Sequence, residues 1–367
     1  MKYAVHVMGM DSSKYGGLER FNVALSKKLA ENGIQSVFMY ESYPESLEFV
    51  DDLTKTDASL LVSNSRKHPL KFCIDFVKTI IKYRPVVVHA HFTKARFYAI
   101  PLAWLLGVKR LFFTIHSGID PKSQIKPWTR VWFGLANKMA KVIVVSDSIA
   151  SVYVTNWPNA QVKRIYLGVS SPSADRDESR KHLGIPSGTV MLLTVANFNH
   201  IKGLDVLVRA IAFLVKQGRW NQNACLYILG QPEQDMRELK KMTDAMEIED
   251  VVKMRGISNE VACYMAAADI YIQPSRSEGI GLALMEAASY SLPLIGSRVG
   301  GIPEVVRDGE NGFLVQPEDE VQLAERIYDQ MQDPHLRKRF GEKSFNVFEE
   351  SFSIESGVRE TFEYYCN

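Results

Sequence analysis

Residues 274–287 read PSRSEGIGLALMEA, and a second glycine-rich stretch, GGIPE, follows at residues 300–304. The short apolar run at residues 270–273 ends at a proline, which predicts a buried strand and its exit. From about Gly281 onward the residues favour a helix. A glycine-containing turn from strand to helix lets the backbone approach a ligand closely and directs N–H groups and the positive helix end at an anion. The residues expected to hold a phosphate are Gly279, Ile280, Gly281 and Leu282.

Two carboxylates flank this turn, Glu278 before it and Glu286 in the early turns of the expected helix. A carboxylate does not attract phosphate, but it accepts hydrogen bonds from ribose or sugar hydroxyls. Such a pair alone is weak evidence, because a solvated helix face explains most glutamates at this spacing. Together with the glycine turn and the GGIPE stretch, the pair predicts a site for a ligand that carries both phosphates and hydroxyls.

The length of 367 residues favours two domains, and 46% hydrophobic residues are enough for two cores. The longest apolar run, residues 97–108, contains a proline and is too short to span a bilayer. We find no pattern of a signal peptide. The four cysteines form no CxxC or Cys/His cluster, so we expect reduced thiols in a cytoplasmic protein and assign them no role.

Charge differs sharply between the two halves of the chain. Residues 1–165 carry a net charge of +11 and residues 166–367 a net charge of −9. A basic half is typical of proteins that meet nucleic acid, an anionic substrate or a membrane surface. We expect no nucleic acid here, but an anionic membrane is a candidate partner.

Two segments of the basic half could rest on anionic lipid. The first interleaves Lys71, Lys78, Lys82 and Arg84 with Phe72, Phe76, Ile80 and Ile81; the second places Trp128 and Trp132 beside Lys126 and Arg130. The alternative is an ordinary helix that faces the core and exposes its lysines to water.

Strand and helix patterns alternate twice along the chain. Strands are expected at residues 3–8, 86–89, 111–115 and 142–145, and again at 190–195, 226–229, 251–254 and 269–272. A polar stretch rich in Ser, Pro, Asp and Arg follows residue 165 and predicts an interdomain connection. The fold class expected is therefore α/β, with two Rossmann-like domains built on parallel sheets.

The stretch around Glu278 and Glu286 resembles the Glu-x7-Glu motif of the retaining glycosyltransferases of family 4. The resemblance implies a GT-B fold, in which two Rossmann-like domains face each other across a cleft. The implied domains are 1–167, which binds the acceptor, 168–345, which binds the nucleotide sugar, and a last helix at 346–367 that returns to the first domain. It also implies that Glu286 holds the ribose, that Glu278 contacts the donor sugar, and that the amides of Gly281 and Leu282 hold the diphosphate.

Other stretches resemble the same family. Gly16 and Gly17 stand in its amino-terminal glycine loop, His91 at its strand end, and His116 at the position of its cleft histidine. The family carries an Arg and, five positions later, a Lys directed at the leaving diphosphate; here Lys202 is present, but Asn197 replaces the Arg. Arg255, Gly256 and Ile257 resemble the family's loop that borders the nucleotide base. The alternatives to these binding roles are an ordinary tight turn for the two glycines, a structural role for His91 and a solvent-exposed Lys202.

The resemblance implies a metal-independent hexosyltransferase that retains configuration and needs no cofactor. The donor would be a UDP- or GDP-sugar and the acceptor a hydroxyl of a glycan or lipid-linked glycan, in cell-surface polysaccharide synthesis at the cytoplasmic face of the membrane. The Asp175-Arg-Asp177 motif lies in the polar connection, so we expect no metal there. Two alternatives stay open, a sugar-nucleotide epimerase of the same architecture and a non-catalytic module that binds sugar nucleotides.

Overall fold

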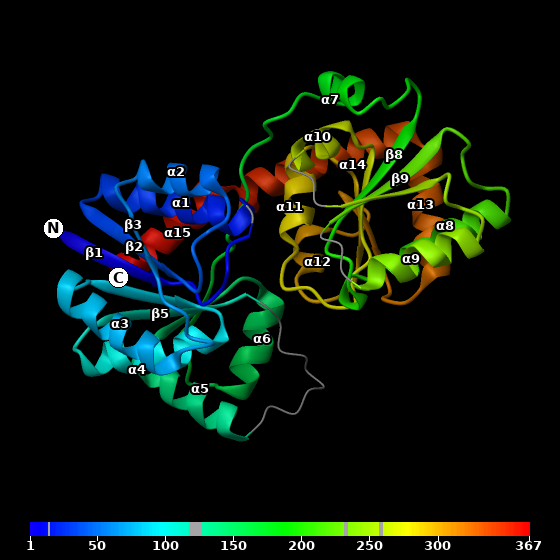
Figure 1. The fold of residues 1–367 in the computed structure, drawn as a ribbon. Helices are drawn as coiled ribbons and strands as arrows, with labels where there is room; N and C mark the ends of the chain where they lie inside the picture. Colours follow the sequence, from blue (N-terminus) through cyan, green and yellow to red (C-terminus); the bar gives the residue numbers. More distant parts are fainter. Residues whose placement is uncertain (14, 117–126, 231–233, 257–259) are drawn as a thin grey trace. The chain divides into compact units, whose positions relative to one another are not determined.

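The computed structural model describes the whole chain except residues 14, 117–126, 231–233 and 257–259. The chain divides into two compact units (Figure 1). Unit 1 comprises Met1–Val169 and Ile354–Asn367, and unit 2 comprises Ser170–Ser353. No described helix combines the length and the apolarity needed to cross a membrane.

Unit 1 is built on a parallel sheet of seven strands in the order β3-β2-β1-β4-β5-β6-β7. The strands are β1 (Lys2–Val7), β2 (Ile34–Tyr40), β3 (Ser59–Val62), β4 (Val87–His91), β5 (Arg110–Ile115), β6 (Lys141–Val144) and β7 (Val162–Arg164). The central strands are almost fully buried, which is why they read as continuous apolar runs rather than as alternating ones.

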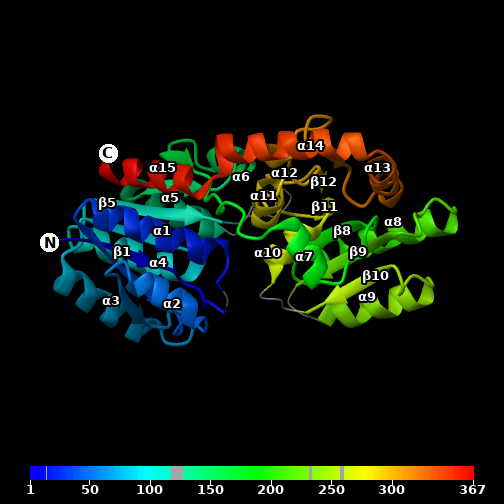
Figure 2. The ribbon, with the colours of Figure 1, turned by 90° about the horizontal axis from the view of Figure 1, so that it is seen from above.

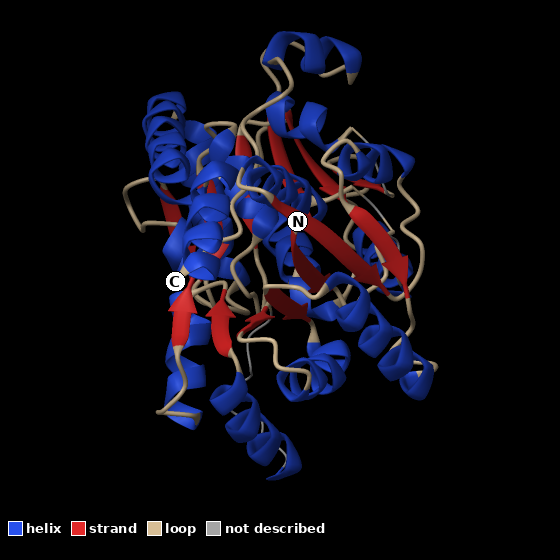
Figure 3. Cartoon of the chain, turned by 90° about the vertical axis from the view of Figure 1, so that its left-hand side faces the viewer, coloured by secondary structure: helices blue, strands red, loops and turns tan. Residues whose placement is uncertain are grey.

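Helices cover both faces of this sheet (Figures 1 and 3). They are α1 (Gly17–Glu31), α2 (Leu47–Thr54), α3 (Pro69–Tyr83), α4 (Thr93–Leu105), α5 (Pro127–Met139), α6 (Asp147–Asn156) and α15 (Ile354–Cys366). The terminal helix α15 packs on α1. Gly357 lets α15 approach the 166–167 backbone closely, because a Cβ there would lie 2.3 Å from the carbonyl oxygen of Tyr166.

Unit 2 repeats the plan with six parallel strands in the order β10-β9-β8-β11-β12-β13. They are β8 (Val190–Val195), β9 (Ala224–Leu229), β10 (Val252–Arg255), β11 (Ile270–Gln273), β12 (Leu294–Ser297) and β13 (Gly312–Val315). All eight strands expected from the sequence are present with shifts of one or two residues. The prediction of two Rossmann-like domains on parallel sheets is confirmed.

The helices of unit 2 also lie on both faces of its sheet, and Figure 2 shows them from a second side. They are α7 (Arg176–His182), α8 (Leu204–Lys216), α9 (Gln234–Ala245), α10 (Val261–Ala267), α11 (Leu282–Ser289), α12 (Ile302–Val305), α13 (Glu320–Gln332) and α14 (Pro334–Val347), with a short 3-10 turn η1 (His200–Lys202) before α8. Helix α8 packs on α13 on one face, and α11 packs on α14 on the other.

The carboxyl-terminal segment differs from the single last helix expected at residues 346–367. Helix α14 ends at Val347 and runs into a π-helical turn, η2 (Phe348–Phe352), before α15 begins at Ile354. Ser353 between them is extended, with φ −69° and ψ 144°. The chain passes from unit 2 to unit 1 at this break.

Candidate functional site

The candidate site of unit 2 lies at the carboxyl ends of β8 and β11. After β8 the chain builds β9 and β10 on one side and then returns to place β11, β12 and β13 on the other. Doubly wound sheets bind ligands at such a point, where the strand order reverses. Asn197 and Lys202 follow β8, and Glu278 and Glu286 follow β11, so the fold brings both predicted groups to this edge.

Lys202 and Glu278 contact each other directly. The Lys202 Nζ lies 2.7 Å from the Glu278 Oε2, and the two side chains are 23% and 13% exposed. Sequence reasoning placed both residues in the site but did not predict that they pair. The pair keeps Lys202 oriented, and it leaves a cation beside the start of α11.

A chain of hydrogen bonds from buried side chains holds the Glu278 carboxylate in place. Gln273 Nε2 donates to Glu278 Oε2 at 3.2 Å, and Ser275 Oγ donates to the same oxygen at 3.3 Å. The Tyr271 hydroxyl donates to Gln273 Oε1 at 2.9 Å. Burial raises the pKa of Tyr271, and the nearby charges of Glu286 and Glu278 raise it further. Tyr271 is therefore a neutral donor that fixes the amide of Gln273.

Gln273, Ser275 and Tyr271 were missed in the sequence. A polar Gln at the end of an otherwise apolar strand was the available signal, because a buried amide requires hydrogen-bond partners.

Three glycines allow the close packing of this loop. Gly203 has φ +63°, and a Cβ there would lie 2.0 Å from the carbonyl oxygen of Pro274. A Cβ on Gly300 would lie 1.8 Å from the carbonyl oxygen of Glu278, and one on Gly301 would lie 2.5 Å from that of Gly279. The GGIPE stretch thus packs against the 278–279 backbone and fixes the turn that precedes α11.

Arg276 ties the Lys202 segment to the same loop. Its guanidinium donates to both carboxylate oxygens of Asp205 at 2.7 and 2.8 Å and to the His200 carbonyl at 2.6 Å, and it pairs with Glu318. Burial raises the pKa of Asp205, but the hydrogen bonds and charge of Arg276 outweigh it and hold this pKa at about 2. No sequence signal pointed to this pairing, because the two partners are 71 residues apart.

The turn itself has the predicted form. Gly281 is the N-cap of α11 with φ +85°, and the helix begins at Leu282. The first N–H groups of a helix have no partner within it, so those after Gly281 are directed at the sheet edge. Glu286 lies in the first turns of α11, is half-buried, and is close enough to Tyr271 to affect its pKa.

The remaining donor-site residues of unit 2 lie at neighbouring strand ends. Asn197 is half-buried after β8, and Gly230 packs closely there, since a Cβ on it would lie 1.9 Å from the Ala196 carbonyl oxygen. Arg255 ends β10 and is exposed, with its guanidinium 6.0 Å from the ring centre of Tyr227, and Gly256 follows it. Ile257 lies outside the described residues.

In unit 1 the glycine loop and two histidines lie at the equivalent edge of the sheet. Gly16 is the N-cap of α1, and its N–H donates to Glu19 Oε2 at 3.1 Å. Gly17 begins α1. The Glu19 carboxylate therefore occupies part of this helix start.

His91 and His116 are in hydrogen-bond contact. His91 Nδ1 lies 3.0 Å from His116 Nε2, and the His116 ring stacks on Phe92 at 4.6 Å. Burial, with a smaller effect from the charge of Arg96, lowers the pKa of His116 to about 3. His116 is thus neutral near pH 7 and can exchange hydrogen bonds with a hydroxyl without bringing a charge. His91 is thus a hydrogen-bond partner of the His116 ring and not an isolated buried histidine.

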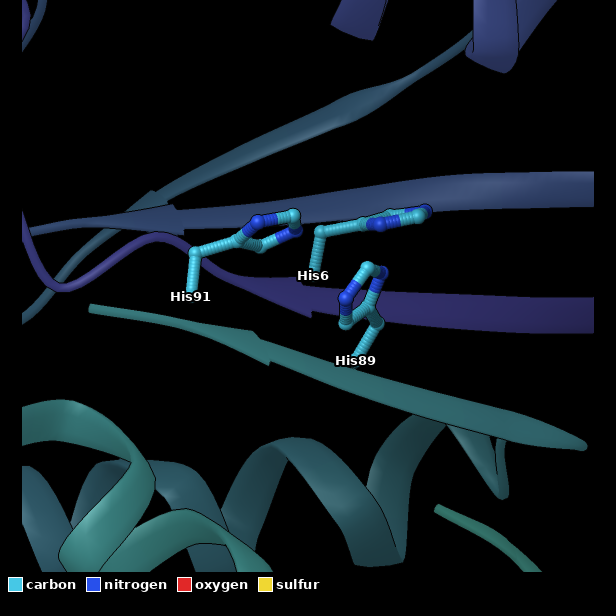
Figure 4. Close-up of side chains that lie close together, drawn as sticks. All are labelled: His6, His89 and His91. Atoms are coloured by element: carbon cyan, nitrogen blue, oxygen red, sulfur yellow. The ribbon is translucent and has the colours of Figure 1, made fainter. Parts of the chain in front are cut away.

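A row of buried histidines extends from this pair into unit 1 (Figure 4). His6, His89 and His91 have ring nitrogens within 4.8 Å of one another, a spacing that a metal ion could exploit. Both nitrogens of His89 already have partners, the Tyr365 hydroxyl and Thr114 Oγ1. In this arrangement His89 therefore has no free ring nitrogen for a metal ion, and a metal at the three histidines would have to break one of its two hydrogen bonds.

Comparisons with known proteins match both halves of the chain to glycosyltransferases. A family model described as "Glycosyltransferase Family 4" matches residues 15–171, and one described as "Glycosyl transferases group 1" matches residues 175–347. The N-acetyl-alpha-D-glucosaminyl L-malate synthase of Bacillus anthracis is 25% identical over 94% of this chain and 92% of its own length. A D-inositol 3-phosphate glycosyltransferase of Thermobifida fusca is 25% identical over 89% of this chain and 83% of its own.

Solved structures resemble the whole chain. A glycosyltransferase of Rickettsia africae has a TM-score of 0.84 at 20% identity and covers 99% of this chain and 98% of its own. HepE of Anabaena, solved with UDP-glucose, has a TM-score of 0.83 at 20% identity and covers 99% of this chain and all of its own. At these identities the likeness concerns the fold.

Proposed function

Because this chain belongs to glycosyltransferase family 4 and its activity is the transfer of a glycosyl group, we propose that its donor is a UDP- or GDP-sugar of the hexose type. We propose further that the acceptor is a hydroxyl of a glycan or lipid-linked glycan, that the configuration at the sugar is retained, and that no metal ion or cofactor takes part. Synthesis of a cell-surface polysaccharide is the process that fits these substrates.

The observation that carries the proposal is the Lys202–Glu278 pair beside the start of α11. It puts one cation, a row of helix N–H groups and two carboxylates within one loop system, which is the chemistry that a nucleoside diphosphate sugar requires. In this arrangement the diphosphate lies against residues 279–282 and Lys202. Glu286 accepts the ribose hydroxyls, and Glu278 accepts those of the sugar.

In this reaction the protein mainly positions the donor and the acceptor and stabilises the charge that develops on the diphosphate. The acceptor oxygen forms a bond to the anomeric carbon as the bond from that carbon to the diphosphate breaks, on the same face of the sugar. The acceptor proton passes to the departing phosphate oxygen, so atoms and charge balance without a protein base. Lys202 and the start of α11 stabilise the negative charge that collects on the diphosphate.

His116 has a role that its neutral state permits. Its ring can accept or donate one hydrogen bond to a hydroxyl of a bound sugar, while the other nitrogen is held by His91 at 3.0 Å. The low pKa of His116 keeps this ring uncharged at neutral pH, so it would contact a sugar hydroxyl without bringing a positive charge.

The membrane partner is proposed from the outer sides of α3, α4 and α5, which lie on one face of the sheet of unit 1 (Figure 1). We call this surface the α3–α5 face. Its exposed apolar side chains are Leu70, Ile74, Ile81, Tyr98, Trp104, Leu105, Trp128, Val131 and Leu135. In α3, α4 and α5 the single acidic residue is Asp75, whereas the face carries several exposed lysines and arginines. Apolar and basic side chains together match an anionic lipid surface.

One part of the sequence-based interpretation of this face was wrong. Phe72, Phe76 and Ile80 are buried in the core, so they cannot contact lipid. Leu70 and Ile74 take their place at the surface, 81% and 55% exposed, one helical turn apart.

Thermal unfolding with a panel of UDP- and GDP-sugars tests the donor. We expect one donor to raise the melting temperature in the presence of a chelator, because a ligand that binds only the folded state stabilises it. Transfer should then require both that donor and an added glycan acceptor. Release of free nucleotide or an epimerised sugar without an acceptor would favour the epimerase instead.

Vesicle sedimentation tests the α3–α5 face. We expect binding to vesicles with anionic lipid, weakened by salt, and little binding to zwitterionic ones. Ile74→Glu should reduce this binding, whereas Val321→Glu, a substitution of an exposed valine in unit 2, should not. Equal binding to both lipid types would remove the membrane partner from the proposal.

A further inference from the structure

Arg96 of helix α4 is an unusual residue in unit 1, because its charged side chain is buried. The residue is 5% exposed, and its guanidinium lies 4.6 Å from the ring centre of Phe133 and 5.6 Å from that of Phe113. Side chains in a helix point back toward its N-terminus, so Arg96 is directed toward the sheet edge where α4 begins. In the sheet Phe113 pairs with Ala90, one residue before His91.

The guanidinium has no counter-charge in the part of the chain that the structure describes. No described carboxylate is close enough to affect the pKa of its guanidinium, and its Nε is buried without a hydrogen-bond acceptor. Burial lowers the pKa of Arg96 to about 10, which still leaves the group charged at neutral pH. The aromatic rings offset only part of the desolvation, since a cation–π contact contributes less than a buried ion loses.

A second unpartnered donor lies in the same region. The Tyr153 hydroxyl donates to Asn137 Oδ1 at 2.7 Å, which uses the acceptor of that amide. The Asn137 Nδ2 is buried and has no described partner. The Tyr153 ring centre lies 5.8 Å from that of Phe133. The Phe133 ring also makes the cation–π contact with Arg96. The region thus holds unused N–H groups on α4 and α5.

Buried donors without acceptors are costly, and proteins retain them where a ligand supplies the missing acceptor. A guanidinium matches the oxygens of a carboxylate or a phosphate. The N-terminus of the 13-residue helix α4 adds a positive partial charge at the same sheet edge. Arg96 is also close enough for its charge to affect His116.

We propose that Arg96 and Asn137 bind an anionic group, a phosphate or a carboxylate, on the acceptor substrate. This assignment rests on the proposed function in one respect, that unit 1 receives the acceptor. It deepens that function, because it restricts the acceptor to a molecule that carries a negative charge near the hydroxyl to be glycosylated. A neutral oligosaccharide would leave Arg96 without a partner.

Thermal unfolding in inorganic phosphate, against chloride at equal ionic strength, tests the site. We expect phosphate at several times its Kd to raise the melting temperature of unit 1 by roughly 2–4 °C. Arg96→Met should remove the share of this rise that the unit 1 site contributes, and Arg96→Lys should keep part of that share. The share contributed by the phosphate site of unit 2 should remain in both variants. Arg359→Met, which removes an exposed arginine from α15 of the same unit, should respond as the unaltered protein does. Malonate in place of phosphate shows which of the two anions gives the larger rise.

The stability of Arg96→Met in chloride separates a binding residue from a structural one. If Arg96 awaits a ligand, the variant should unfold at the same or a higher temperature, because an unpaired buried charge is gone. A loss of several degrees, or a phosphate response equal to that of the unaltered protein, would overturn the proposal. So would the absence of any response to both anions. Donor binding by Arg96→Met stays intact in either case, so a failure of the proposed donor chemistry would show separately.

Discussion

At the scale of single residues, the proposed mechanism depends most on the side chain of Lys202. The family places an arginine where this chain has Asn197, and an amide donor brings no charge. In the proposed donor site, Lys202 is therefore expected to be the main side-chain cation among the described residues, together with the helix start at Gly281. Glu278 orients it at 2.7 Å and is itself held by Gln273 and Ser275.

Lys202→Ala should lower the turnover number on the order of 10²-fold or more, because negative charge grows on the diphosphate in the transition state. Asn197→Ala should have a much smaller effect, since it removes one neutral donor. Steady-state kinetics in the presence of a chelator make the measurement, with Lys216→Ala on the exposed side of α8 as the control. Near-normal turnover of Lys202→Ala would show that another group neutralises the diphosphate.

The buried histidines predict a dependence of stability on pH. Burial lowers the pKa of His6 to about 3, against about 6.5 in the unfolded chain. The unfolded state then binds more protons than the folded state between these values, so stability falls as the pH drops from about 6.5 toward 3. Each such histidine contributes up to about 1.4 kcal/mol per pH unit in this window. Urea unfolding at pH 7.0 and 5.5 should show a smaller pH effect for His6→Leu than for the unaltered protein. An equal effect in both would contradict the neutral state of His6.

At the scale of elements, the sequence predicted best what is buried and regular. The strand at 190–195 coincides with β8 because five of its six residues are apolar and the segment is flanked by turn residues. Strands β2, β3, β7 and β13 were not predicted. Of these, β3 and β7 are short edge strands of four and three residues without a fully buried residue. Strand β12 was missed because its sequence LIGS contains a glycine and a serine. The glutamates and the glycine turn were visible, whereas the Arg276–Asp205 pair depends on contacts distant in sequence.

The glycines of the GGIPE stretch give a prediction that separates the effect of backbone strain from the effect of a steric clash. Gly300→Ala would place a Cβ 1.8 Å from the Glu278 carbonyl oxygen at φ +52°. Gly188→Ala also has a positive φ, +80°, but has nothing within 4 Å. The first variant should be less stable than the second by roughly 1–3 kcal/mol, the range for overpacking. It should also bind nucleoside diphosphate weakly, because the turn before α11 shifts. Calorimetry of both variants checks this, and equal stability would mean that the loop adjusts freely.

At the scale of the whole molecule, the chain has the GT-B fold, with one doubly wound unit for each half of the sequence. The two halves of the sequence differ in charge, +11 for residues 1–165, which lie in unit 1, and −9 for residues 166–367, most of which lie in unit 2. The candidate residues divide in the same way, with the histidines and Arg96 in the basic unit and the paired glutamates in the acidic one. A basic unit suits an anionic acceptor or an anionic membrane, while the donor site relies on local charges within an acidic surround.

The central claim is that Glu286 and Glu278 divide the donor between them, ribose to the first and sugar to the second. Calorimetric titration of UDP and GDP, each with a matching nucleotide sugar, tests this in the unaltered protein, Glu286→Ala and Glu278→Ala. Glu286→Ala should weaken nucleoside diphosphate and nucleotide sugar alike, by about 1–3 kcal/mol for a lost charged hydrogen bond. Glu278→Ala should leave nucleoside diphosphate binding unchanged and weaken only the nucleotide sugar. An equal loss of nucleoside diphosphate binding in both variants, or no binding of either nucleotide to the unaltered protein, would contradict the account.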